Sequence, residues 1–375
     1  MASVLVPSEH LPYGVYSLPG RAPRVGVRNG DAVVDAHAVT GVDELLTGSL
    51  NAFMALGPDA WRRAREELLE VADRAEQIPL SEVTLHLPVE VADYVDFYCS
   101  LHHATNVGRI FRPDGEPLSP NWRHLPVGYH GRAGTVVVSG TGVVRPSGQR
   151  VPTSSTDGVP SYGPSLRLDL EAELGFVVGV PSTQGTRVPT SAFADHVFGV
   201  TLLNDWSARD LQAWETVPLG PFLGKSFATS ISPWVTPLAA LEAARVPLPG
   251  QKPVPLPYLD VDEPAGFDIA VEVMLNGEVI SRPPYASTYW SPAQMLAHLT
   301  VNGASLRTGD LFGSGTISGA EPDQRGSLLE VGWGSEDAFL EDGDVVTLRA
   351  SAPGTAGERI VLGEVTGHVL PSAEQ

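Results

Sequence analysis

The sequence predicts a mostly β protein with few helices. Of its 375 residues, 39 are glycine and 33 are proline, which exceeds average usage, shows no collagen-like period and favours many turns. Residues 165–180 alternate between apolar and polar side chains, which is the period of a strand. The pairs Asn29-Gly30 and Asn276-Gly277 carry the strongest short-range signal for a hairpin. The length suggests two or three domains.

The N-terminal part, residues 1–85, is interpreted as a separate small domain. Short strands interrupted by turns are expected over residues 1–48, with a hairpin over 25–35. A helix is expected from about Pro58, with Asp59 as its cap. Its apolar residues recur at helical spacing, at Trp61, Ala64, Leu68 and Val71. The linker-like segment 77–81 follows, so we place a domain boundary near residue 85. We expect this domain to act as a scaffold or in dimerisation.

Strands dominate the remaining chain, residues 86–375. The clearest expected strands cover residues 135–138, 165–180, 197–203, 267–280 and 344–350. One helix is expected from Ser291-Pro292, a cap followed by proline in the first turn, to about Val301. Residues 246–265 are rich in proline and are interpreted as an extended surface loop.

Charge and cysteine content exclude several classes of protein. Asp and Glu outnumber Lys and Arg by 44 to 24, and the formal charge of −20 argues against nucleic acid and against an anionic membrane surface as partners. Cys99 is the single cysteine, so an intramolecular disulfide is excluded and a reducing compartment is expected. The N-terminus carries no signal-peptide pattern, and no apolar run is long enough to span a bilayer. We expect a soluble cytoplasmic protein.

Four acids suggest a metal site made of oxygen ligands. Glu171 and Glu173 share one face of the strand expected over 165–180, roughly 7 Å apart at the backbone. A solvated strand face is the alternative, but two glycines and a valine continue the same face. Asp205 follows an apolar strand, and Asp96 precedes an aromatic pair. Because no Cys or His pair accompanies these acids, Ca²⁺, Mg²⁺ or Mn²⁺ is favoured over zinc.

A general base is sought among the adjacent residues His102 and His103. Neighbouring side chains point in different directions, and a lone histidine is more often a packing or surface residue. Asp96 and Tyr98 lie close in sequence and favour one of the pair as a base, a role for which imidazole is suited near neutral pH. Arg112 emerges from apolar sequence and suits a substrate carboxylate, with a surface salt bridge as the alternative.

Candidate donors follow Asp205. Arg209 and Gln212 are three residues apart, so a helical turn there would place both on one face, where they could donate to one developing oxyanion. Lys225 lies in a Gly-Lys-Ser sequence, but Gly220 is too close to Gly224 for a phosphate loop, so nucleotide binding is rejected. The glycine-rich segment 313–319 is interpreted as a loop.

Together these segments resemble the fumarylacetoacetase family, and they follow in the same order. The segments that carry the resemblance are 96–108, 120–122, 129–132, 171–173, 204–212, 218–227 and 314–322. The match covers nearly all of residues 90–370. The resemblance implies an SH3-like β-barrel for the small N-terminal domain and a mixed β-sandwich roll for residues 86–375. It also implies a homodimer with its sites near the interface.

The resemblance implies a role for each matching residue. The ligands of Ca²⁺ or Mg²⁺ are Asp96, Glu171, Glu173 and Asp205, with Lys225 and Thr229 near the magnesium position. His103 is the base that activates water, and Glu330 orients it. The oxyanion stabilisers are Arg209, Gln212 and Lys225. The residues that hold the substrate are Tyr98, Arg112, Gln212, Thr216 and Thr316. Thr216 departs from the pattern, because the family generally has tyrosine there and threonine is too short for the same contact.

The activity that the resemblance implies is hydrolysis of a carbon–carbon bond in a small diketo dicarboxylate. The expected substrate is 4-fumarylacetoacetate and the products are fumarate and acetoacetate, the last step of tyrosine and phenylalanine breakdown. One alternative is a hydrolase, decarboxylase or isomerase of the same superfamily that acts on another acylpyruvate or diketo acid. Another is a non-catalytic calcium-binding β module, which would need the acids but neither His103 nor Arg112.

Overall fold

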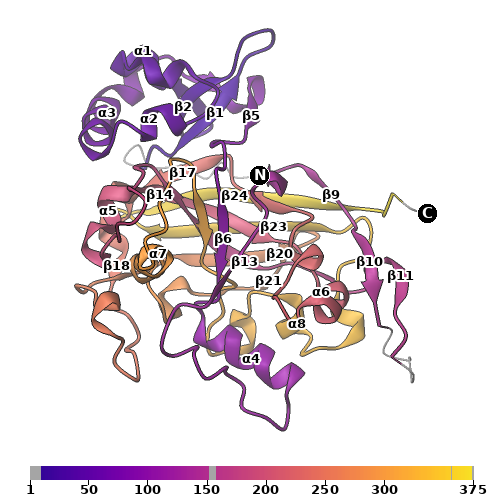
Figure 1. The fold of residues 1–375 in the computed structure, drawn as a ribbon. Coiled ribbons are helices and arrows are strands. Elements are labelled where there is room, and N and C mark those ends of the chain that lie inside the picture. Colours follow the sequence, from indigo (N-terminus) through magenta and orange to yellow (C-terminus); the bar gives the residue numbers. More distant parts are fainter. Residues whose placement is uncertain (1–9, 152–157, 356, 374–375) are drawn as a thin grey trace.

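The fold is mostly β, as the sequence predicts, and it is dominated by one large sheet (Figure 1). The computed structural model describes residues 10–151, 158–355 and 357–373. The large sheet has 13 strands, with β4-β3-β2-β1-β17-β14-β13-β22-β6-β7 as its main path. A five-stranded sheet has the order β21-β20-β23-β24-β9. Among the described residues, no helix is both long and apolar enough to cross a membrane.

The elements have the following bounds. The strands of the large sheet are β1 Tyr13–Ser17, β2 Arg24–Asn29, β3 Ala32–Asp35, β4 Ile78–Pro79, β5 Thr84–His86, β6 Tyr94–Phe97, β7 Gly128–His130, β8 Val136–Val138, β13 Ala172–Val178, β14 Val197–Asp205, β16 Thr229–Ile231, β17 Trp234–Pro237 and β22 Leu311–Gly313. The strands of the five-stranded sheet are β9 Gly142–Val144, β20 Ala270–Leu275, β21 Glu278–Ser281, β23 Val345–Pro353 and β24 Arg359–Leu370. The short strand pairs are β10 Ser147–Arg150 with β11 Ser161–Pro164, β12 Leu168–Asp169 with β15 Ser207–Ala208, and β18 Arg245–Val246 with β19 Gly266–Phe267.

The α-helices range from 4 to 14 residues in length. The α-helices are α1 Ala36–Thr40, α2 Asn51–Met54, α3 Pro58–Val71, α4 Leu101–Phe111, α5 Phe193–His196, α6 Arg209–Glu215, α7 Pro292–Thr300 and α8 Leu328–Val331. The 3₁₀ turns used below are η4 Ala133–Thr135 and η6 Leu223–Lys225. Helix α7 begins as predicted, with Ser291 as its cap in a capping box with Gln294. The predicted turn Asn276-Gly277 joins β20 to β21, and both residues have positive φ.

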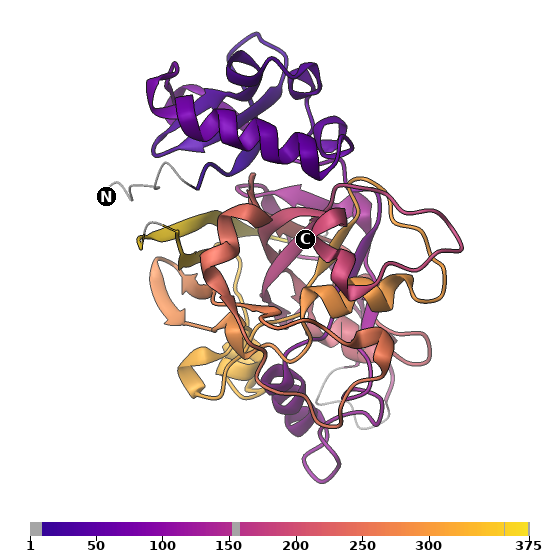
Figure 2. The ribbon, with the colours of Figure 1, turned by 90° about the vertical axis from the view of Figure 1, so that its left-hand side faces the viewer.

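The N-terminal part forms a lobe of its own above the rest of the molecule, with α3 across its strands (Figure 1 and Figure 2). No closed barrel is found among the described residues, so the expected SH3-like barrel is not confirmed. Instead β1 pairs with β17, which makes the N-terminal strands continuous with the large sheet. The hairpin of β2 and β3 forms as predicted, but its loop is Gly30-Asp31 because Asn29 still pairs with Ala32. The domain boundary near residue 85 stays a prediction.

The predicted helix α3 forms, with a different cap from the one expected. Gly57, with φ of 85°, occupies the N-cap and makes no side-chain hydrogen bond, while Asp59 lies within the first turn. Ala64 and Leu68 are buried, and the ring of Trp61 meets Phe198 of β14 edge-on at 5.3 Å. The helix therefore packs partly on the large sheet, and the apolar core of the lobe extends into β13 and β14.

The expected strand over 165–180 is divided into two pieces. β12 pairs with β15, Glu171 makes an isolated bridge with Ser327, and β13 begins only at Ala172. β14 and β22 pair with the two edges of β13, and every residue of β13 is buried, so packed side chains cover both of its faces. A solvated strand face is therefore wrong for Glu173, which is fully buried.

Candidate active site

Four carboxylates that are distant in the sequence meet at one end of the large sheet. Asp96 lies in β6, Glu173 in β13, Asp205 at the end of β14, and Glu171 just before β13. Since β13 runs antiparallel to β14 and β22, and β6 runs parallel to β22, all four fall at the same end. One oxygen of each lies within 4.8 Å of the others, and all four residues are buried. This is the set that the sequence predicted.

The glycine-rich segment after β22 forms one wall of this cluster. The backbone amide of Gly315 donates to Asp96 Oδ1 at 3.2 Å and to Glu173 Oε2 at 3.0 Å. A side chain on Gly313 would place its Cβ 2.5 Å from Asp96 Oδ1 and 2.8 Å from Glu173 Oε2. Gly315 has φ of 74°, in the region that favours glycine. Sequence reasoning interpreted the segment as a plain loop and missed this contribution.

Crowding and burial make the cluster unfavourable for negative charge alone. Burial, followed by the charge of Asp205, raises the pKa of Asp96 to about 8. Burial and the neighbouring carboxylates also raise the pKa of Glu173 well above its usual value, and burial raises that of Asp205. Glu173 Oε1 is buried and has no hydrogen-bond partner in the described part of the chain. A bound cation would relieve both the repulsion and the unpaired oxygen.

Two buried cations partly balance the cluster. Lys225, in η6, donates from Nζ to Glu171 Oε2 and to Asp205 Oδ2, the latter at 2.8 Å. Arg209 Nη2 lies 2.7 Å from Glu171 Oε1. Although burial opposes ionisation, these two cations hold the pKa of Glu171 well below its usual range. Burial also opposes the charge of Lys225, but Asp205 and Glu171 raise its pKa above the usual value, so it stays an ammonium.

The histidine–carboxylate pair that the resemblance implied is formed. His103 Nδ1 lies 2.6 Å from Glu330 Oε2, and His103 Nε2 faces the cluster, 3.9 Å from Glu171 Oε1. Burial opposes ionisation of Glu330, but His103 and the surrounding donors lower its pKa, so the carboxylate accepts from Nδ1. Its other donors are Asn106, Ser318 and Ser327, each at 2.9 Å. His102, the residue before His103 in α4, is half-buried.

Two hydroxyl groups hold Asp205. Thr229 Oγ1 donates to Asp205 Oδ1 at 3.1 Å. Thr229 therefore lies beside the carboxylate cluster, where the resemblance expected it. Tyr129 of β7 donates to Asp205 Oδ2 at 2.9 Å. Sequence reasoning did not assign Tyr129, although it lies in the segment 129–132 that carried the resemblance. The register Asp96↔Tyr129 between β6 and β7 explains its position.

The expected turn after Asp205 is helix α6, which begins at Arg209. Arg209 Nη1 donates to Gln212 Oε1 at 3.3 Å, so the two side chains lie on one face as predicted. Thr216 ends the helix, and its hydroxyl donates to the backbone oxygen of Gln212 at 2.6 Å. Gly224 packs on α6, where a Cβ would meet Gln212 N at 2.7 Å.

The remaining predicted substrate residues have different environments. Tyr98 meets the ring of His103 edge-on at 5.2 Å. Thr316 is buried, and its hydroxyl has no hydrogen-bond partner among residues 10–151, 158–355 and 357–373. Arg112 is exposed after α4, where its guanidinium donates to the backbone oxygens of Glu116 and Pro117. The structure therefore brings Tyr98 to His103 and shows no contact of Arg112 with the acids.

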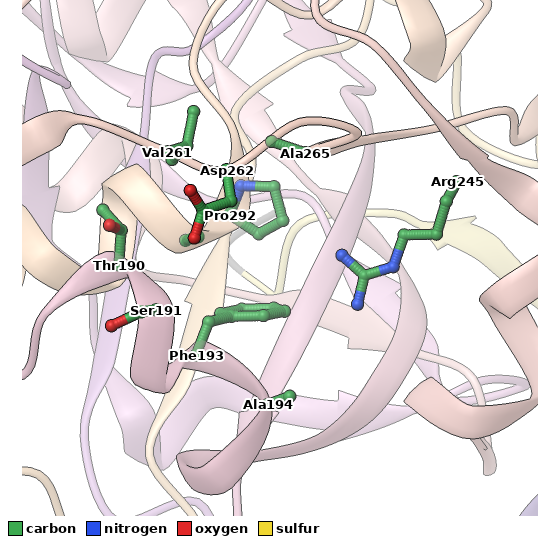
Figure 3. A pocket seen from close by; sticks show the side chains of 10 residues that line it. Thr190, Ser191, Phe193, Ala194, Arg245, Val261, Asp262, Ala265 and Pro292 are labelled. Carbon is green, nitrogen blue, oxygen red and sulfur yellow. The ribbon is translucent and has the colours of Figure 1, made fainter.

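A surface pocket elsewhere in the molecule contains none of the predicted residues. This pocket of about 180 Å³ lies beside Phe193 and Pro292 (Figure 3). Arg245 lines this pocket. Its guanidinium carbon lies 4.7 Å from the centre of the Phe267 ring, and its Nη2 lies 3.7 Å from Glu242 Oε1. Asp262 also lines the pocket and adds a carboxylate to it. With its cation already engaged, this pocket offers no competing anion site.

Family models match both parts of the chain. The C-terminal model of fumarylacetoacetate (FAA) hydrolase matches residues 93–368, and the N-terminal model of fumarylacetoacetase matches residues 9–88. The chain belongs to the fumarylacetoacetase family. Fumarylacetoacetases of Rattus norvegicus, Homo sapiens and Arabidopsis thaliana are 45%, 46% and 42% identical to it, each over 98% of this chain and 96% of the relative.

Solved structures share the fold at lower identity. A fumarylacetoacetate hydrolase from psychrophilic Exiguobacterium antarcticum is similar with a TM-score of 0.61 at 18% identity, covering 96% of this chain and 99% of the other. A maleylpyruvate hydrolase from Sphingobium, in complex with manganese(II) ion and pyruvate, gives 0.57 at 16% identity, covering 96% of this chain and 100% of the other. At this identity the similarity extends to the fold alone.

Proposed function

We propose that this chain hydrolyses 4-fumarylacetoacetate to fumarate and acetoacetate. The observation that carries the proposal is the buried pair of His103 and Glu330 facing a four-carboxylate cluster. Membership of the fumarylacetoacetase family along nearly the whole chain supports the same substrate. A non-catalytic calcium module would need no such base.

A divalent cation fits the four carboxylates. The donors are Asp96, Glu171, Glu173 and Asp205, all oxygen ligands, which suit Ca²⁺, Mg²⁺ or Mn²⁺. Glu173 Oε1 has no hydrogen-bond partner in the described residues. Burial, followed by the charge of Asp205, raises the pKa of Asp96, and a bound cation would offset both effects. Such an ion, when bound, supplies polarisation of a carbonyl oxygen. As an ammonium, Lys225 has no lone pair for the ion and would act as a neighbouring cation, while Thr229 would orient Asp205.

Protein groups account for the proton transfer. With Nδ1 donating to Glu330, neutral His103 has its lone pair on Nε2, and this atom faces the cluster. Nε2 takes a proton from water, whose oxygen adds to the carbonyl carbon beside the fumaryl alkene. The carbon–carbon bond to the acetoacetyl part then breaks, and the proton from His103 goes to the carbon that leaves.

The remaining polar residues are proposed to stabilise negative charge on the reacting oxygen and to bind the ends of the substrate. Arg209, Gln212 and Lys225 are the candidates for stabilising the oxyanion, and their mutual contacts at the cluster support this. The buried hydroxyl of Thr316 has no hydrogen-bond partner in the described residues. It is therefore available to donate a hydrogen bond to a substrate oxygen. Tyr98 and Arg112 remain proposed substrate residues, Tyr98 because it lies against His103.

Purified protein incubated with fumarylacetoacetate tests the proposal. Loss of the conjugated diketone absorbance reports cleavage, and we expect it in the presence of Ca²⁺, Mg²⁺ or Mn²⁺. A chelator should abolish cleavage, and adding the ion back should restore it. Full activity in excess chelator would refute the metal site, and no cleavage under any ion would refute the substrate.

Thr216 favours a second candidate, hydrolysis of another diketo acid or acylpyruvate. Its hydroxyl is engaged with Gln212 O and the side chain is short, so it cannot replace a tyrosine contact. If fumarylacetoacetate is the substrate, Thr216→Tyr should lower KM with kcat nearly unchanged, because a hydrogen bond to a charged group contributes about 1.5–3 kcal/mol. Thr216→Val is the matched control, since it keeps the size. An unaltered KM in Thr216→Tyr would favour the second candidate.

We also propose a cytoplasmic homodimer, with residues 1–85 as the N-terminal domain and 86–375 as the catalytic domain. Support for self-association comes from apolar side chains beside the site. Val217, Leu219 and Phe222 are 83%, 97% and 64% exposed in the loop that leads from α6 to η6. Clustered exposure of this kind is typical of interaction surfaces. Sedimentation should give twice the chain mass of 39.7 kDa, and a monomer at micromolar concentration would refute the assembly.

A further inference from the structure

Asp169 is a fully buried carboxylate next to the candidate site but outside the four-carboxylate cluster. It lies in β12, and its two oxygens accept hydrogen bonds from two separate parts of the site. Oδ2 accepts from Arg209 Nε at 2.8 Å. The backbone amide of Leu328 donates to Oδ1 at 2.8 Å, and that of Leu329 donates to Oδ2 at 3.1 Å. Asp169 therefore joins the start of α6 to the first turn of α8.

Each of these two parts carries a group of the proposed mechanism. Arg209 reaches Glu171 with its other end, Nη2, at 2.7 Å. Glu330 follows Leu329 directly and holds His103 Nδ1 at 2.6 Å. His103 Nε2 and Arg209 Nη2 both approach Glu171 Oε1. Together with the covalent link from Leu329 to Glu330, these contacts close a ring. It runs from Asp169 through Arg209, Glu171, His103, Glu330 and the backbone amide of Leu329 back to Asp169.

We propose that Asp169 is a positioning residue that fixes Arg209 relative to the His103–Glu330 pair. This role rests on the proposed function, because it assigns Arg209 to the oxyanion and His103 to the water. Asp169 contacts neither reacting group directly, and it acts through the guanidinium and through the backbone of α8. Supporting groups of this kind typically change activity by about 10- to 100-fold when they are lost.

The charge and shape of Asp169 are both needed for this role. Asp169 accepts hydrogen bonds from four donors, which are Arg209 Nε and the backbone amides of residues 170, 328 and 329. An asparagine would present an NH₂ group to at least one of them, whichever way it turned. Arg209 would then keep only Glu171 as an anionic partner, so its guanidinium should move toward the cluster.

Asp169→Asn in the full-length, metal-loaded protein tests the proposal. We expect kcat for fumarylacetoacetate to fall about 10- to 100-fold with KM changed less than twofold, because the contacts of the bound substrate are retained. In combination with Glu330→Gln, the losses should be less than multiplicative, since both substitutions disturb one unit. A folded Asp169→Asn protein with kcat within twofold of wild type would overturn the proposal.

Asp310→Asn is the matched control for burial. Asp310 is a buried carboxylate that accepts from the backbone amide of Arg307 and lies outside the ring. Its substitution should lower thermal stability and leave kcat within twofold. If Asp169→Asn does not fold, Asp169→Glu keeps the charge but places the carboxylate one methylene further out, and kcat should still fall at least fivefold. Wild-type kcat in folded Asp169→Glu would equally overturn the proposal.

A readout without substrate separates this inference from the proposed function. The Nδ1 proton between His103 and Glu330 should give a downfield proton resonance that is absent in His103→Ala. That resonance should shift or broaden in Asp169→Asn and remain in place in Asp310→Asn. If wild-type protein cleaves no fumarylacetoacetate, the proposed function fails, while a shifted resonance still supports positioning by Asp169. An unshifted resonance in folded Asp169→Asn refutes it.

Discussion

At the scale of single residues, the role proposed for His103 at Nε2 depends on what its other nitrogen, Nδ1, contacts. Glu330 Oε2 accepts a hydrogen bond from Nδ1, and three neutral side chains hold that carboxylate in place. With Nδ1 held by Glu330, Nε2 is the ring nitrogen that faces the carboxylate cluster, 3.9 Å from Glu171 Oε1. Within the described residues, the adjacent His102 makes no hydrogen bond to Glu330, so position on α4 distinguishes two identical side chains.

Substitution of the pair tests this arrangement. His103→Ala should lower kcat about 10²–10⁴-fold, the usual contribution of a general base. Glu330→Gln should lower it less, and the double variant should lose little more than His103→Ala, since the two act as one unit. Metal affinity, measured by calorimetry, should be nearly unchanged in all three proteins. Multiplicative losses, or near-normal kcat in His103→Ala, would contradict the assignment, and His102 would then be tested.

At the scale of elements, the four-carboxylate cluster depends on where strands end rather than on a local motif. The register Gly313↔Asp96 between β22 and β6 sets one carboxylate beside a residue without a side chain. The turn that follows supplies the Gly315 amide to two carboxylates. Strand order therefore gathers the acids, and the glycines make room for them.

Gly313→Ala measures how much this space matters. The new Cβ would lie 2.5 Å from Asp96 Oδ1, closer than a contact allows, so Asp96 and Glu173 should be displaced. We expect affinity for Ca²⁺ or Mn²⁺ to fall at least about tenfold in calorimetric titrations. Gly134→Ala is the control, because a Cβ there, in η4, meets nothing within 4 Å. Equal affinity in Gly313→Ala and wild type would show that the carboxylates adapt.

At the scale of the whole molecule, the N-terminal lobe is tied to the large sheet by pairing and by packing. β1 pairs with β17, and the ring of Tyr13 contacts Phe198 at 5.4 Å. His10 is fully buried at this junction, with Nε2 2.8 Å from Thr236 Oγ1 of β17. Burial first, then the charges of Arg65 and Arg28, lowers the pKa of His10 to about 3.

This histidine predicts acid sensitivity of the junction. Its pKa is lower in the folded protein than the ordinary 6.5, so the unfolded chain binds the extra proton. Stability should therefore decline as pH falls from about 6.5 toward 3, by a few kcal/mol at most. His10→Gln should flatten this decline in thermal melts between pH 7 and 4. His368→Gln, at an exposed position, is the control, and an equal pH slope in His10→Gln and wild type would contradict the prediction.

The sequence by itself determined the class of fold, several boundaries and the identity of most polar residues in the site. Proline and glycine content, the alternation of apolar and polar side chains, and turn and cap residues all bias the backbone of their own segment. They therefore predicted a mostly β chain, helix α7 and the turn at Asn276-Gly277. The acids could be recognised as a set because their types suit one kind of ion. The pairing of His103 with Glu330 came only through the resemblance, since 227 residues separate them.

The tertiary structure alone decided which of these residues touch and which face of each strand is buried. Alternation over 165–180 could not distinguish a solvated face from a buried one, because that depends on which other segments pack over each face of the sheet. Phe176 of β13, for example, packs against Phe193 and against the distant Tyr285. The same reason hid the contacts that Gly313, Tyr129 and Asp169 make around the cluster. A local pattern specifies the direction of a side chain along its own strand, whereas its neighbours are set by the register of other strands.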